Sequence, residues 1–149
     1  MLVSGNLTTW PMSAVGLIGR GEHIDLDVPS VHTLSHNGRF GACFTVQTDS
    51  CIIVVDVYDL VRREKLFSTT VQMTAESDVN TFDCAVSCHG PLLFILFKDV
   101  VHWYCRVGSK QGEWKKNGMS HFNHILCSAG GRRVVLNSQE DAIGLSVSD

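Results

Sequence analysis

The chain has 149 residues, with 12 basic and 15 acidic side chains and a formal net charge of −3. Its hydrophobic content of 44% and charged content of 18% are those of a folded chain and exclude a disordered one. The charges are scattered singly, which excludes the basic patch that binds nucleic acid or anionic lipid. A chain of this length forms one domain, so we treat residues 1–149 as a single unit.

Membrane and secretory patterns are also missing from the sequence. The longest apolar run, 91–97, is too short to cross a bilayer, and the N-terminus lacks a basic region followed by an apolar core. The six cysteines lie inside apolar runs, without the dense loop spacing of a secreted disulfide scaffold. We therefore expect a soluble cytoplasmic protein with reduced thiols.

Short apolar runs rich in Val, Ile, Phe and Cys alternate along the chain with clusters of Gly, Asn, Ser, Asp and Lys. No window keeps a helical period over about ten residues, which favours many short strands. The best helix candidate, 58–65, is short and ends a strand, so we expect a loop there. The clearest strand candidates are 41–47, 51–56, 66–72, 82–88, 92–97, 100–107, 123–127, 133–136 and 142–147. This pattern predicts an all-β fold of antiparallel hairpins.

A four-residue turn pattern, Ser-x-x-Gly, recurs before three of these strands. Its copies begin at Ser35, Ser87 and Ser128, at intervals of 52 and 41 residues. These intervals bracket the period of about 40–45 residues that is typical of a four-stranded propeller blade. In the first copy, Asn37-Gly38 predicts a type I′ hairpin turn, because both residues tolerate a positive φ.

A second element follows each turn: an apolar strand that ends near an aromatic or acidic residue. In the first unit it ends in Tyr58-Asp59, in the second it is the run 100–104, and in the third it is 143–147, with Ser146 at the aromatic position. Tyr58-Asp59 resembles the Trp-Asp pair that gives WD40 repeats their name. Together with the recurring turn, it makes the chain similar to divergent WD40-repeat β-propellers.

The resemblance implies a WD40-like β-propeller fragment of about three and a half four-stranded antiparallel blades. The expected blades are roughly 1–28 (partial), 29–76, 77–117 and 118–149 (partial). Complete propellers carry about four to eight blades. The resemblance therefore implies either a segment of a longer multidomain protein or copies that associate to complete a ring.

The function implied is a scaffold for protein–protein interaction, without chemistry of its own. The alternative is a β-sandwich or barrel domain with a ligand-binding or enzymatic role. Repeat geometry separates the two, because a sandwich does not require the turn to recur at blade-like intervals, whereas a propeller does.

Motifs for metal binding or catalysis are not found in the sequence. Cys84, Cys88 and His89 gather near one turn but lack the closely spaced pairs of a structural zinc site, and on a strand the two cysteines share a face with Val86 as small core residues. The sequence has no G-x-S-x-G elbow and no phosphate-binding glycine loop of the Walker type. We expect no metal, no cofactor and no enzymatic activity.

Exposed aromatic and basic side chains are the better candidates for function, because contacts that dominate protein interfaces favour Trp, Tyr and Arg. One group lies in a single hairpin and another in the basic loop after Tyr58. The candidate partner-binding residues are Trp103, Tyr104, Arg106, Trp114, Arg62 and Arg63. The alternative for Trp103 and Tyr104 is packing between blades.

Overall fold

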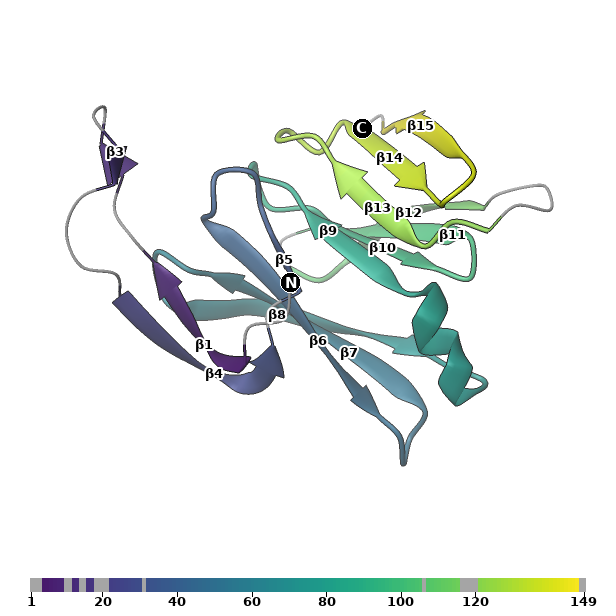
Figure 1. The fold of residues 1–149 in the computed structure, drawn as a ribbon, viewed down its shortest axis with the longest axis horizontal. Helices are drawn as coiled ribbons and strands as arrows, with labels where there is room; N and C mark the ends of the chain where they lie inside the picture. The colour runs from purple at the N-terminus through teal and green to yellow at the C-terminus, as the bar shows by residue number, and fades with distance from the viewer. Residues whose placement is uncertain are drawn as a thin grey trace.

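The computed structural model describes residues 4–9, 12–13, 16–17, 22–30, 32–105, 107–115 and 121–147, with side chains described from residue 32 onward. The described chain is all-β, which confirms that prediction, and its strand pairings are antiparallel. The strands form three larger sheets and two two-stranded sheets (Figure 1). In this part of the chain no sheet closes on itself.

Within each larger sheet, the strands follow one another in chain order. The first sheet contains β5 (Thr33–Leu34), β6 (Phe40–Gln47), β7 (Ile52–Asp59) and β8 (Glu64–Gln72). The second contains β9 (Asp83–Val86), β10 (Leu93–Phe97), β11 (Val100–Tyr104) and β12 (Lys110–Lys115). The third contains β13 (His124–Cys127), β14 (Arg133–Asn137) and β15 (Ala142–Ser146).

The remaining elements lie outside the three larger sheets. A 3₁₀ helix, η1 (Glu76–Thr81), connects the first sheet to the second. The two pairs are β1 (Ser4–Thr9) with β4 (Glu22–Ser30), and β2 (Met12–Ser13) with β3 (Gly16–Leu17). Except for the last two residues of β4, they fall in the region 1–28 expected to form the first, partial blade, and only their backbone is described. The loop expected at 58–65 is shorter in the structure: residues 60–63 form a turn, whereas 58–59 belong to β7 and 64–65 to β8.

The recurring Ser-x-x-Gly turn has one geometry in all three copies. In each, the serine amide donates to the carbonyl oxygen five residues on, at 2.8–2.9 Å, and that residue's amide donates to the serine Oγ, at 2.8–3.1 Å. The glycine takes a left-handed φ each time: 73° at Gly38, 69° at Gly90 and 71° at Gly131. Each turn joins the first strand of its sheet to the second.

The predicted type I′ turn at Asn37-Gly38 is wrong. Gly38 has a positive φ, but Asn37 is not among the residues that do. Instead, the Asn37 Oδ1 accepts hydrogen bonds from the Ser35 hydroxyl at 2.8 Å and the Arg39 amide at 3.1 Å. Four residues therefore separate Ser35 from Phe40, a loop length usually built around a type I turn.

The core consists of two apolar interfaces on opposite faces of the second sheet. Along β10, Leu93 and Ile95 pack toward the first sheet, and Phe94 and Leu96 pack toward the third. All four side chains are at most 1% exposed. A strand buried on both faces is a continuous apolar run, which is why the sequence of β10 does not alternate.

The first strands of the three sheets lie next to one another, because β9 contacts both β5 and β13. Asp83 at the start of β9 joins them. Its Oδ1 binds the Nε2 of His32, directly before β5, and its Oδ2 accepts the amide of Ile125 in β13 at 2.9 Å. The sheets therefore meet along their first strands, and their last strands lie on the outside.

Candidate functional site

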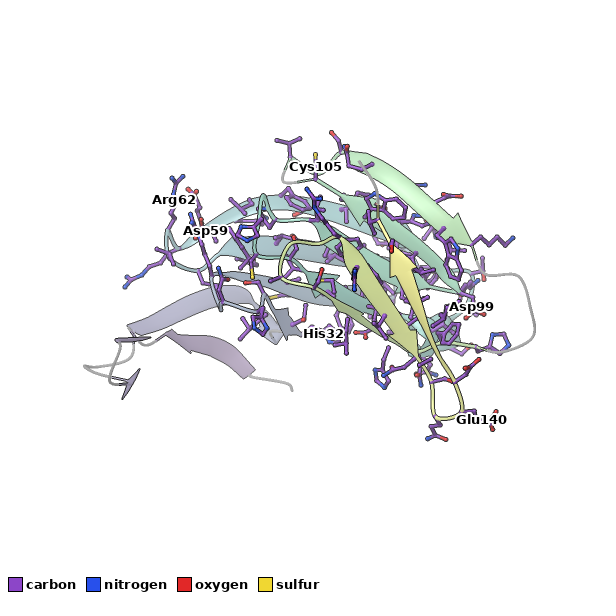
Figure 2. All side chains as sticks on the ribbon, turned by 90° about the horizontal axis from the view of Figure 1, so that it is seen from above. His32, Asp59, Arg62, Asp99, Cys105 and Glu140 are labelled. Atoms are coloured by element: carbon purple, nitrogen blue, oxygen red, sulfur yellow. The ribbon has the colours of Figure 1, made fainter. Side chains whose placement is uncertain are left out.

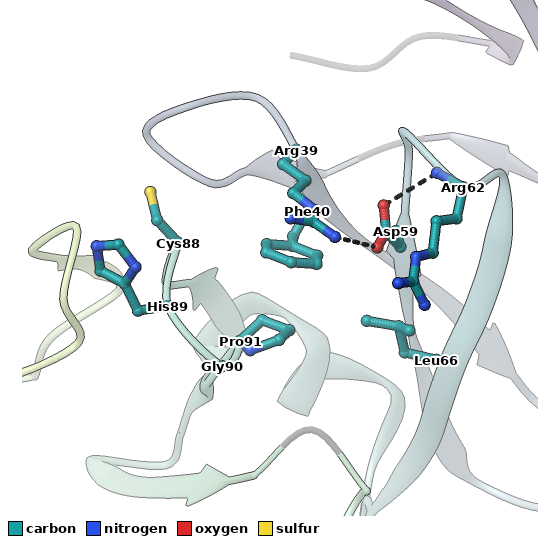
Figure 3. A pocket seen from close by; sticks show the side chains of 9 residues that line it. All are labelled: Arg39, Phe40, Asp59, Arg62, Leu66, Cys88, His89, Gly90 and Pro91. Atoms are coloured by element: carbon teal, nitrogen blue, oxygen red, sulfur yellow. Dashed lines mark hydrogen bonds and ion pairs between the residues drawn. The ribbon is translucent and has the colours of Figure 1, made fainter.

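A hollow of about 450 Å³ lies between the first two sheets (Figure 3). Its walls come from the Ser35 turn, the turn between β7 and β8, and the Ser87 turn. We call it the rim hollow. It is lined by Arg39, Phe40, Asp59, Arg62, Leu66, Cys88, His89, Gly90 and Pro91.

The rim hollow lies at one end of the stacked sheets. Figure 2 shows Asp59 and Arg62 toward the end opposite to Asp99 and Glu140, which mark the turns before β11 and β15. Turns from two sheets therefore meet around the hollow. Its lining residues lie in these turns or at strand ends, except Leu66, which lies within β8. Loops held by a rigid scaffold are where binding residues concentrate.

Asp59 anchors the wall formed by the first sheet. It is 3% exposed, and its Oδ1 accepts the backbone amides of Val61 and Arg62, each at 3.1 Å. Its Oδ2 accepts the Nη2 of Arg39 at 3.1 Å. Burial acts to raise the pKa of Asp59, but these donors outweigh it and hold the pKa below the usual 3.8. The carboxylate stays charged and fixes both the turn and the Arg39 guanidinium.

Arg62 and His89, on the two walls of the hollow, remain accessible to a ligand. The Arg62 side chain is 68% exposed, and its Nη1 lies 3.8 Å from Glu64, too long for a hydrogen bond. His89 is exposed on the opposite wall (Figure 3). The half-buried Leu66 supplies apolar surface between them. Cationic and apolar groups side by side can hold an acidic residue of a partner together with an apolar neighbour.

Two of the predicted partner-binding residues lie at or beside this hollow. Arg62 lines it, and Arg63 follows in the same turn, exposed and with a φ of 57°. A positive φ is uncommon for a residue with a side chain and occurs where the surrounding turn imposes it. Both arginines are exposed, and their role in binding stays a prediction.

The predicted aromatic residues lie elsewhere. Trp103 and Trp114 are half-buried and pack in the interface between the second and third sheets, where they line a smaller cleft of about 120 Å³. Tyr104 is 8% exposed and packs in the opposite interface, against the first sheet. It has little surface to offer a partner. Arg106 lies outside the described residues.

Several lining residues of the rim hollow were not predicted from the sequence, chiefly Arg39, Asp59 and His89. A signal for two of them was present, because Phe40 pairs with Asp59 across β6 and β7. Joining the Ser35 turn to the Tyr58-Asp59 end of the next strand as one hairpin would have placed Arg39 beside Asp59. His89 could be placed only by knowing which turns of different sheets are neighbours.

Comparison with models of known protein families and with curated proteins gave no match. Among the residues that the structure describes, no helix is long and apolar enough to cross a membrane. In the same part of the chain, no three or more His, Cys, Asp or Glu residues are grouped so that they could hold a metal ion.

Proposed function

We propose that the chain is a β-propeller segment of the WD-repeat type and serves as a scaffold for protein–protein interaction, with the rim hollow as its binding surface. The observation that carries this proposal is the recurring turn. It joins the first and second strands of three successive sheets with the same hydrogen bonds and the same glycine conformation. One supersecondary unit is therefore used three times in succession.

The arrangement of the sheets favours a propeller over a sandwich. Each sheet is a meander in chain order, and the connections run from the last strand of one sheet to the first strand of the next. Sandwiches commonly return strands to a sheet by longer Greek-key crossovers. The sheets also meet along their first strands through Asp83, as blades do around an axis.

The register within the sheets supports equivalent blades and changes which residue occupies the aromatic position in the third unit. Tyr58 pairs with Gly41, which lies six residues after Ser35. In the same way, Tyr104 pairs with Leu93, six residues after Ser87, and Leu145 pairs with Val134, six residues after Ser128. Leu145, and not Ser146, therefore occupies the aromatic position in the third unit. An aromatic or apolar residue therefore occupies this position in all three sheets, whereas an acidic residue follows it only in the first, as Asp59.

A binding role suits the rim hollow better than a catalytic one. The Asp59 carboxylate is already engaged by three donors, so it is a poor general base. Cys88 is 9% exposed, and its backbone amide donates to the Ala129 carbonyl.

The six cysteines are free thiols, which supports a cytoplasmic setting as part of the proposal.

The test compares protein partners recovered with variants of the tagged full chain. Arg62→Glu reverses the charge of the hollow, and Lys115→Glu makes the same change on the exposed β12, away from it. Partner proteins are quantified by mass spectrometry after affinity purification. Some should be recovered equally with the unchanged chain and with Lys115→Glu, whereas their amount with Arg62→Glu should be lower by about fivefold or more. Equal recovery with all three chains would contradict the proposal, provided that circular dichroism shows each to be folded.

A further inference from the structure

The charges that the rim hollow presents to a ligand are positive. Of the described residues that line it, Asp59 is the single acidic one, and it is buried with both oxygens accepting hydrogen bonds. The side chain of Arg39 is 44% exposed, and that of Arg62 is more exposed still. Asp59 offsets one of the two guanidinium charges, so the hollow keeps a net positive charge that favours an anionic ligand.

Arg39 is held in place on one side of the Asp59 carboxylate (Figure 3). Its Nη2 donates to the Asp59 Oδ2 at 3.1 Å, and its Cζ lies 5.1 Å from the centre of the Phe40 ring. The bond to Asp59 uses one of the five N–H groups that a guanidinium carries. A side chain that is fixed before binding loses little conformational entropy on binding. Arg39 is therefore suited to donate to a ligand from a fixed position.

Arg62 lies on another side of the same carboxylate (Figure 3). Its backbone amide donates to the Asp59 Oδ1 at 3.1 Å, which fixes the start of its side chain. Its Nη1 lies 3.8 Å from the Oε1 of Glu64, beyond hydrogen-bond length, and both side chains are exposed. Glu64 is thus an anion of the chain itself that stands beside Arg62 without binding it tightly.

The presence of Glu64 favours a ligand with more charge than a carboxylate. Glu64 follows Arg62 by two residues, so its carboxylate is present beside the guanidinium at a high effective concentration. A carboxylate of a partner would compete with an equal group. A phosphate ester carries a charge of about −1.5 to −2 at neutral pH and three acceptor oxygens, so it can accept hydrogen bonds from two guanidinium groups at once.

We propose that the rim hollow binds a phosphorylated side chain of a partner protein between Arg39 and Arg62, and that the phosphate displaces Glu64 from Arg62. This inference rests on the binding role proposed for the hollow and names the group that it recognises. Residues next to the phosphorylated one contact Leu66 and His89. Glu64 acts as a selectivity residue, because it disfavours acidic segments that are not phosphorylated.

The test measures which peptides the immobilised full chain retains. Three libraries of short peptides have the same random flanking residues and differ at the central position, which is a phosphorylated Ser, Thr or Tyr, the same residue without phosphate, or Glu. Mass spectrometry of the bound peptides should find the phosphorylated library enriched about tenfold or more over the other two. Inorganic phosphate should displace these peptides only at millimolar concentrations, because it lacks the flanking contacts.

Three variants separate this site from other basic surfaces. Arg62→Glu should abolish retention of the phosphorylated library. Glu64→Gln should increase it about twofold to fivefold, because removing an exposed competing carboxylate has an effect of that size. Lys115→Glu, on the exposed β12, should leave it unchanged. Circular dichroism of each variant verifies that it is folded, and the NMR signals of the Arg39 and Arg62 guanidinium groups should shift when the enriched peptides bind.

Phosphatase treatment separates this inference from the proposed function on which it rests. Proteins whose recovery depends on Arg62 should be lost when the lysate is dephosphorylated before affinity purification. If they are recovered equally after dephosphorylation, the hollow binds partners without a phosphate, so the inference is wrong while the scaffold function stands. If no protein depends on Arg62, the scaffold function proposed for the hollow fails as well.

Three results with the peptides would also overturn the inference. Equal retention of the Glu and phosphorylated libraries would show that the hollow does not select phosphate. Unchanged retention in Glu64→Gln would show that Glu64 does not compete for Arg62. Inorganic phosphate that binds as tightly as the best peptide would make the hollow a site for the free anion.

Discussion

The carboxylate of Asp83 accepts the backbone amide of Ile125 at 2.9 Å, across 42 residues of chain and between two different sheets. The same side chain accepts its neighbour's amide, that of Cys84, also at 2.9 Å. The oxygen that accepts the Cys84 amide, Oδ1, also binds the Nε2 of His32, which lies directly before the first sheet. One buried aspartate thus links the first strands of three successive sheets.

Replacing Asp83 should weaken the whole assembly. In Asp83→Ala the buried Ile125 amide loses its acceptor, and an unsatisfied buried donor costs about 1–3 kcal/mol. Urea denaturation should therefore show a free energy of unfolding lower by at least that amount. Asp49→Ala, which removes an exposed carboxylate in the turn after β6, is the control and should change little. Equal stability of the two variants would mean that Asp83 does not join the sheets.

The left-handed glycine of the recurring turn can be tested with two adjacent residues. Gly131 has a φ of 71°, and a Cβ there would lie 3.0 Å from Leu92 Cδ1 and 3.1 Å from Ser87 Cβ, on the neighbouring sheet. Gly131→Ala should lower the free energy of unfolding by about 1 kcal/mol or more.

The neighbouring residue provides the control for that substitution. A Cβ on Gly130 would meet nothing within 4 Å, and Gly130 is not among the residues with a positive φ. Gly130→Ala should leave the thermal midpoint almost unchanged. Equal loss of stability in both variants would mean that the left-handed φ of Gly131 is not what makes glycine necessary in this turn.

The pH dependence of stability should report on Asp59. Its pKa in the folded chain is lowered below 3.8, so its favourable contribution is fully present above that pH and is lost as the pH falls through the folded pKa. The unchanged chain should be more stable than Asp59→Asn at neutral pH, and the difference should shrink in acid. Urea unfolding at a series of pH values measures it. A difference that is independent of pH would show that the charge of Asp59 does not hold the turn.

Cysteine reactivity should differ between two half-exposed thiols. The pKa of Cys105 is lowered, chiefly by the amide of Val107 and also by donors from Ser109, whereas burial raises the pKa of Cys127 to about 11. Because the thiolate is the nucleophile, iodoacetamide near neutral pH should modify Cys105 well before Cys127. Peptide mass spectrometry over time gives the order, and faster labelling of Cys127 would contradict the described turn around Cys105.

Much of the fold could be predicted from local sequence. Strands such as β6 and β10 are apolar, β-branched or aromatic runs between turn residues, and the Ser-x-x-Gly turns mark where three sheets begin. The polar edge strand β12 was not among the predicted strands, because only Trp114 turns its side chain into the interface and the rest face solvent. The 3₁₀ helix η1 has no apolar period to reveal it.

The contacts between sheets could not be predicted in the same way. Asp83 lies next to a cysteine in an otherwise apolar run, and nothing near it in sequence indicates that His32 and Ile125 are its partners. The turn of Lys98 and Asp99 likewise has two positive φ values, 49° and 62°, without glycine or asparagine. Local patterns give strands and turns, whereas the sites depend on which turns of different sheets become neighbours.

The most direct test of the account is a set of NMR nuclear Overhauser contacts in the isotopically labelled chain. We predict contacts from the Ile125 amide to the Asp83 side chain and from the Cys88 amide to Ala129, together with strand pairing in chain order within each sheet. That result would support three successive sheets that meet along their first strands. Contacts that pair strands of different sheets, such as β8 with β12, would contradict it and favour a sandwich.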